Sequence, residues 1–207
     1  MRVDASQASR LSLLTALLSL VLGGAILGLG LTEGAIALWG FGLACLLQVP
    51  PALSLRGRIL EGLGNRGLER DRLTLRVVSH LLRVLALGMA MASISALLGG
   101  RAPQASLTTL ELTVVVAGLE AFLWLAKRGL VGIHQALALD AARTRTMLEL
   151  AALLLVGNLL GHWFPWADAV TGLVLALRLF LEGRTLAKGT TLQAAACGGC
   201  GTGCGCG

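Results

Sequence analysis

Four cysteines near the end of the chain have a spacing typical of a metal-binding segment. Cys197, Cys200, Cys204 and Cys206 stand in CGGCGTGCGCG, a C-x2-C-x3-C-x-C pattern among glycines. Glycine lets the backbone fold around one ion, and thiolates select soft cations. The Gly/Cys-rich tail, residues 194–207, is therefore predicted to bind a soft metal ion (Zn or Cu(I)), and no resident cofactor is expected to be required. A low-complexity spacer is the alternative, because the spacing matches no fixed zinc-finger pattern.

Ionisable side chains also stand within long apolar stretches, where they are costly and often functional. Glu120 is the deepest of them, which suggests either an interhelical hydrogen bond or a step for a proton or cation. Glu149 lies one turn from Arg145 and is predicted to pair with it. Asp168 opens the last apolar helix, and its carboxylate is predicted to cap that helix. No nucleophile–base constellation or HExxH-type motif occurs in the sequence, so an enzyme is not expected.

The composition indicates an integral membrane protein. Of 207 residues, 56% are hydrophobic and 14% are charged, whereas about a quarter of a soluble domain is charged. The mean hydropathy is +0.81, and the apolar residues collect into stretches of about 20, the length that a helix needs to cross a bilayer. The net charge of +6 does not indicate nucleic-acid binding, because the basic residues lie between apolar spans and are not interleaved with exposed aromatics. The lipid bilayer is the expected partner.

Six spans follow one another, so the predicted fold is all-α: a polytopic membrane protein with a six-transmembrane-helix bundle. A leader (residues 1–10) precedes a single transmembrane domain (residues 11–193). The second span ends at Pro50-Pro51, where a regular helix must kink or stop. Residues 54–76, the most charged segment, are predicted to form the largest loop and to lie in water. The spans are expected at residues 11–31, 35–53, 77–98 and 107–126, in a long helix over about 131–162, and at 168–181.

The distribution of basic residues predicts the orientation. Of 17 Lys and Arg residues, only Arg101 falls in a connection on the side opposite the termini. Positively charged residues accumulate on the cytoplasmic side of membrane proteins. Both termini are therefore expected in the cytoplasm, with the bundle in a bacterial inner (cell) membrane.

Residues 139–183 carry a resemblance to a known family. They read as two apolar helices joined at HWFPWAD, with an aromatic cluster of the kind that settles at a membrane–water interface. The order of Asp140, this aromatic turn and Ala167-Asp168 resembles the last two transmembrane helices of the cation diffusion facilitator family of divalent-metal exporters. The resemblance extends over about residues 11–193. It implies a six-helix cation-efflux scaffold, acting as a homodimer or as a heterodimer with a related transporter. Many members carry a folded cytoplasmic domain where this chain has its Gly/Cys tail.

In that family, helices two and five each supply two metal ligands spaced four residues apart, on one helix face. The helix-five pair corresponds to Arg143 and Met147, which follow Asp140. Arginine has no free lone pair for a metal and would repel a divalent ion, although it could occupy the site as a tethered cation. Methionine is a soft thioether, suited to Cu(I) more than to zinc. The usual zinc-type site is therefore expected to be lost.

Helix two allows two registers, which place either Phe41 and Cys45 or Ala44 and Gln48 at its ligand positions, and neither pair is a His/Asp pair. Two functions remain. One is a divergent cation-efflux-type transporter for a divalent or soft metal cation, working by alternating access with proton exchange. The other is a non-transporting interaction or metal-sensing protein on the same scaffold. The transport-site positions implied by the resemblance are Cys45, Gln48, Asp140, Arg143 and Met147.

Overall fold

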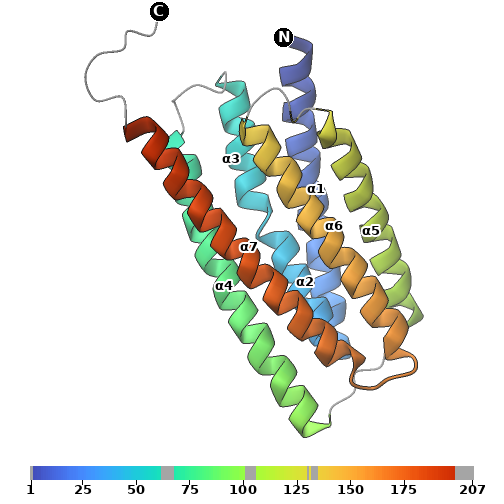
Figure 1. Ribbon diagram of the computed structural model, residues 1–207. Helices are drawn as coiled ribbons and strands as arrows, with labels where there is room; N and C mark the ends of the chain where they lie inside the picture. The colour runs from blue at the N-terminus through green and yellow to red at the C-terminus, as the bar shows by residue number, and fades with distance from the viewer. Residues whose placement is uncertain (1, 62–67, 101–105, 130, 132–134, 199–207) are drawn as a thin grey trace, which may run out of the picture.

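Figure 1 shows a computed structural model that describes residues 2–61, 68–100, 106–129, 131 and 135–198. Every regular element among these residues is an α-helix, which confirms the predicted all-α class. The helices are α1 (Arg2–Glu33), α2 (Ile36–Leu46), α3 (Val49–Leu60), α4 (Leu68–Gly99), α5 (Leu107–Arg128), α6 (Gln135–Gly161) and α7 (Ala167–Gly198).

The helices form one bundle in which successive passes alternate in direction (Figure 1). Helices α2 and α3 follow one another and together make a single pass. Helix α4 packs on α7, α1 on α2 and α5 on α6. Helix α1 begins and α7 ends at the same end of the bundle, called here the termini end. The α1–α2 and α6–α7 connections lie at the other end, called here the turn end, where α4 also ends and α5 begins (Figure 1).

Five stretches of the described chain are long and apolar enough to cross a membrane, which agrees with an integral membrane protein. Helix α7 is not among them, because its inner turns carry Arg178, Glu182 and Arg184. It nevertheless runs along the bundle beside α4 (Figure 1). The five stretches are Ser6–Glu33, Ile36–Leu60, Glu69–Gly99, Leu107–Arg128 and Ala136–Gly161.

The helix boundaries follow from residues with special backbone requirements. Gly34, with φ +68°, ends α1 in a left-handed conformation that glycine adopts without steric cost. The chain breaks between α2 and α3 just before the predicted place, and the prolines fall in the first turn of α3, where no amide hydrogen is needed. Ser106 caps α5 by accepting a hydrogen bond from the Thr109 amide at 3.2 Å.

The helices contact one another through apolar side chains and small residues. Phe41, Met89, Met147 and Leu154 are fully buried in one core shared by α1, α2, α4, α5, α6 and α7. Helix α1 approaches α2 so closely that a Cβ atom added at Gly42 would lie 2.6 Å from the Leu27 backbone nitrogen. Small residues at helix contacts are typical of membrane bundles, in which packing replaces the hydrophobic effect.

The structure corrects the prediction that residues 54–76 form a water-exposed loop. Helix α3 continues to Leu60 and α4 already begins at Leu68. The Arg58 guanidinium pairs with the Asp71 carboxylate at 2.8 Å, and their side chains are only 5% and 10% exposed. Ser54 donates a second hydrogen bond to Asp71 at 3.0 Å. The charges of this segment therefore hold two helices together, because charges that neutralise one another can be buried.

The structure also corrects the role expected for Asp168. It lies in the first turn of α7, yet its carboxylate accepts hydrogen bonds from the α2 backbone amides of Ile36 at 2.9 Å and Ala37 at 3.2 Å. The side chain therefore caps α2, whose own preceding residue, Ala35, has no polar side chain for the purpose. Asp168 thereby joins two helices that are distant in sequence.

Candidate functional site

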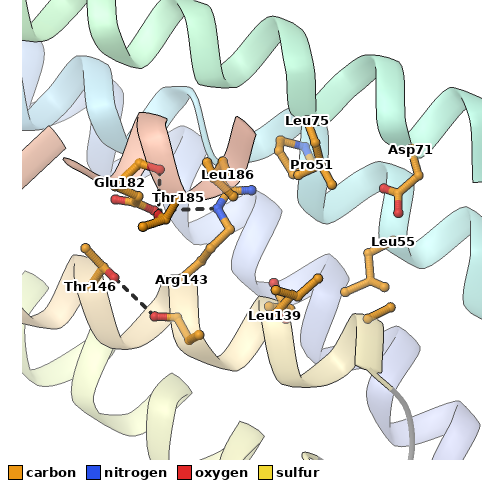
Figure 2. Close-up of a pocket in the computed structure, with 13 residues that line it drawn as sticks. Pro51, Leu55, Asp71, Leu75, Leu139, Arg143, Thr146, Glu182, Thr185 and Leu186 are labelled. Atoms are coloured by element: carbon orange, nitrogen blue, oxygen red, sulfur yellow. Dashed lines mark hydrogen bonds and ion pairs between the residues drawn. The ribbon is translucent and has the colours of Figure 1, made fainter. Parts of the chain in front are cut away.

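A cavity of about 230 Å³ lies between α3, α4, α6 and α7 in the half of the bundle nearest the termini end. Its walls are largely apolar, and Pro51, Leu55, Leu75, Leu139 and Leu186 face it (Figure 2). The charged side chains that reach it are Asp71, Asp140, Arg143 and Glu182. The cavity therefore combines apolar walls with three carboxylates and one guanidinium.

Arg143 and Glu182 face one another across the α6–α7 contact (Figure 2). The Arg143 Nε atom lies 3.7 Å from Glu182 Oε1, and the two side chains are 12% and 7% exposed. That distance is within ion-pair range but too long for a hydrogen bond. Arg143 Nε and Glu182 Oε2 are both buried without a hydrogen-bond partner. The pair is thus held by charge alone and leaves polar atoms unsatisfied.

Asp140 forms a shorter ion pair than Glu182 does. Its carboxylate lies 2.8 Å from Lys127 Nζ on α5, whose side chain is only 4% exposed. Lys127 also donates a hydrogen bond to the Thr144 hydroxyl at 2.9 Å. Neither Lys127 nor Arg58, the partner of Asp71, lines the cavity. In the Lys127–Asp140 and Arg58–Asp71 pairs, the carboxylate lines the cavity, and the basic side chain lies behind the carboxylate as seen from the cavity.

The positions implied by the family resemblance do not converge on one site. Asp140 and Arg143 line the cavity, whereas Cys45, Gln48 and Met147 do not. Met147 is buried in the apolar core with Leu150 and Leu154. Cys45 faces α1, since a Cβ atom added at Gly23 would lie 3.0 Å from the Cys45 Cβ.

The two helix-two registers also differ little in burial. Phe41, Ala44 and Cys45 belong to the core, and Gln48 is buried with its Nε2 atom unpartnered. Within the described part of the chain there is no group of three or more His, Cys, Asp or Glu side chains that could hold a metal ion.

The cysteine tail cannot be placed. Cys200, Cys204 and Cys206 lie outside the described residues. The backbone of Cys197 belongs to α7, but its side chain is likewise outside the description. The predicted soft-metal site therefore remains a prediction.

Glu120 is buried in α5, with 4% of the residue exposed. Its Oε2 atom has no hydrogen-bond partner. The charges that act on this carboxylate come from Lys127, on the same face of α5, and from Asp140 on α6. Glu120 is thus connected electrostatically to the Lys127–Asp140 pair beside the cavity.

Glu149 lies apart from the cavity. As predicted, it pairs with Arg145, at 3.2 Å, and it also pairs with Arg178 of α7 at 2.6 Å. All three side chains are at least one-third exposed on the outer surface of the bundle.

Sequence reasoning missed three members of the site. Glu182 was not recognised as a site residue. It stands near the end of a mostly apolar run, LVLALRLFLEG, and a carboxylate in such a run indicates a special environment. Asp71 was assigned to a loop, and Lys127 fell between the predicted spans at residues 107–126 and 131–162. Their burial depends on partners in other helices, which neither periodicity nor local composition identifies.

No family model matches the chain, and a search of curated proteins finds no relative. The resemblance to cation diffusion facilitators accordingly stays a prediction, and the function has to be argued from the cavity and its charges.

Proposed function

We propose that the chain is a divergent cation-efflux-type transporter and that the cavity beside Glu182 admits its cargo from the termini end. The observation that carries this proposal is the set of carboxylates facing the cavity, Asp71, Asp140 and Glu182, opposed there only by Arg143. Charged groups inside a membrane bundle are costly and are typical of ion pathways. Arg58 and Lys127 neutralise Asp71 and Asp140 from behind, so the attraction for a cation centres on Glu182, whose partner Arg143 lies at 3.7 Å.

Glu120 extends this pathway into the bundle. It precedes Lys127 by seven residues on α5, which at 1.5 Å per residue places it about 10 Å farther from the termini end. Its Oε2 atom has no partner, so the carboxylate can accept a proton or a cation. Proton exchange at Glu120 is the coupling step that we propose, with a divalent or soft metal cation as the counter-ion.

The proposal extends to the number of spans, the orientation in the membrane and the oligomeric state. Helix α7 acts as a sixth span, with Glu182 directed to Arg143 and Arg178 directed to Glu149, both on α6. The termini end faces the cytoplasm of a bacterial cell, because nearly all basic residues lie on that side. The functional unit is a homodimer or a heterodimer with a related transporter.

A non-transporting protein on the same scaffold is the second candidate. The Arg143 guanidinium occupies the position at which the resembled family would hold its metal, and Glu182 neutralises it. A fixed charge at about 4 Å repels a divalent ion by several kcal/mol even at an effective dielectric near 20. This observation favours an interaction or metal-sensing role over metal export.

Transport by purified protein in liposomes distinguishes the two candidates. Uptake of Zn²⁺, Mn²⁺, Cd²⁺ and Cu⁺ would be measured together with the internal pH. A transporter should move at least one of these ions with an opposing proton flux, and Glu120→Gln should reduce that flux more than tenfold. Glu111→Gln is the matched control, since Glu111 is an exposed acid on the same helix. Absence of flux for all four ions in correctly folded protein would refute transport and leave the second candidate.

A further inference from the structure

The Glu182 carboxylate has an unexplained free oxygen. Its side chain is 93% buried, since only 7% of it is exposed, and it lines the cavity. One oxygen lies in ion-pair range of Arg143, while Oε2 has no hydrogen-bond partner. A buried acceptor without a partner is destabilising, and native proteins satisfy nearly all of them. The Glu182 carboxylate therefore has capacity for a further hydrogen-bond donor, and the cavity that it lines is the space from which such a donor can approach.

The pairing of the acids around the cavity favours a cationic donor. Of the three acids that line the space, Asp71 and Asp140 are paired at 2.8 Å with Arg58 and Lys127. Glu182 has its base, Arg143, at 3.7 Å, too far for a hydrogen bond, so its charge is the least completely compensated. A monovalent cation would complete that compensation, whereas an anion would be repelled by Glu182. A bare divalent metal fits less well, because no group of three metal-ligating side chains occurs among the described residues.

The walls require an apolar group on the same ligand. Pro51, Leu55, Leu75, Leu139 and Leu186 surround the charged groups, and they offer nothing to a hydrated metal ion. The volume of about 230 Å³ is below the roughly 300–1,000 Å³ of pockets for drug-sized ligands. The ligand is therefore small, with one charged end and one apolar end.

We propose that this cavity binds a small organic cation, a primary ammonium or guanidinium ion carrying an apolar group, whose charged end donates a hydrogen bond to Glu182 Oε2. The Arg143 side chain acts as a tethered competitor, since it neutralises Glu182 while the cavity is empty. This inference deepens the proposed function, on which it rests for the cavity as the cargo site, by assigning the chemical class of that cargo. It differs from that proposal in not requiring a metal ion.

The test uses four small probes of matched shape or charge. Equilibrium dialysis of the purified full-length protein in detergent would compare benzylammonium with benzyl alcohol, its neutral counterpart, with benzoate, which is anionic, and with methylammonium, which lacks the ring. Benzylammonium should bind at least tenfold more tightly than each of the other three. Equal binding of benzyl alcohol or benzoate would refute the assignment of a cation, and equal binding of methylammonium would refute the apolar group.

Two variants with opposite expected effects separate recognition from damage to the fold. Glu182→Gln should weaken benzylammonium binding at least tenfold, because the charge that holds the ligand is lost. Arg143→Gln should strengthen it several-fold, because the competing guanidinium is removed. A general loss of structure would weaken binding in both, so weaker binding in Arg143→Gln refutes the inference. Glu111→Gln, on the exposed face of α5, is the control that should leave binding unchanged.

The inferred binding of an organic cation and the proposed transport function can be refuted independently of each other. Benzylammonium binding without flux of any cation into liposomes would refute transport but support the inference. Metal flux by a protein that does not bind benzylammonium would refute the inference and leave the proposed function in place.

Discussion

Replacing Asp71 by Asn tests whether the charged segment between α3 and α4 is a packed part of the bundle. The substitution keeps the shape of the side chain but removes the charge that Arg58 meets at 2.8 Å. Removing one partner of a buried ion pair costs about 3–5 kcal/mol, since the remaining charge is left uncompensated. At the surface the same change would cost about 1 kcal/mol or less. The two environments therefore predict clearly different losses of stability.

The assay is unfolding in mixed micelles with increasing dodecyl sulfate, followed by circular dichroism. Glu61→Gln is the matched control, since Glu61 belongs to an exposed pair with Arg70 at 3.8 Å, with side chains 41% and 60% exposed. The double substitution Arg58→Met with Asp71→Leu should recover most of the loss, because two apolar side chains replace two charges together. A loss below about 1 kcal/mol for Asp71→Asn, equal to that of the control, would refute the buried ion pair.

Four further changes test other parts of the molecule. Asp168→Ala should destabilise the protein by about 1–2 kcal/mol, because two α2 amides lose their acceptor; unchanged unfolding would contradict the capping role. Thr32→Cys, at the turn end, should react with a membrane-impermeant thiol reagent from outside the cell, and labelling only from inside would reverse the orientation. Replacing the four tail cysteines by Ser should abolish binding of soft metal to the purified protein, and retention of full metal content would make the tail a spacer. In that background, Arg143→His with Met147→Asp should create weak zinc binding measurable by calorimetry, because an imidazole and a carboxylate one helical turn apart replace a repelling guanidinium and a thioether. Strong zinc binding before these two changes would refute the assignment of a lost site.

Local sequence signals predicted the passes of the bundle and their boundaries at the turn end, whereas α1, α3, α4 and α7 extend well beyond the predicted spans at the termini end. The aromatic turn after Gly161 was placed correctly, and the break predicted at Pro50-Pro51 occurs just before it, at Leu47 and Gln48. Proline geometry and interfacial aromatics act within a few residues. The fourth predicted span, at residues 107–126, agrees with α5 within two residues. Such features depend on the chain immediately around them, and a single sequence contains that information.

The charged contacts were not predictable in the same way. Asp168 reaches an amide 132 residues away in sequence. Charge density assigned residues 54–76 to water, since nothing local shows that Arg58 and Asp71 neutralise each other. Glu182 and Arg143 meet only because α6 and α7 pack side by side. Ion pairs between helices follow from tertiary packing, and an isolated sequence identifies the charges but not their partners.

The two ends of the bundle differ in how completely their carboxylates are satisfied. At the turn end, Asp168 accepts two backbone hydrogen bonds, and Glu33 accepts hydrogen bonds from the hydroxyl groups of Ser106 and Thr109. The cavity lined by Glu33, Thr109 and Asp168 is about 20 Å³, space for one water molecule at most.

Toward the termini end, Asp71 and Asp140 are paired, but two other carboxylates are not fully satisfied. Among the described residues, the buried carboxylate oxygens without a partner belong to Glu120 and Glu182, and the larger cavity adjoins Glu182. A transporter that alternates access needs one closed end and one open end at a time, and unsatisfied acids are expected where the cargo has yet to bind. The asymmetry is what this bundle would show with its turn end sealed and its cavity accessible from the termini end.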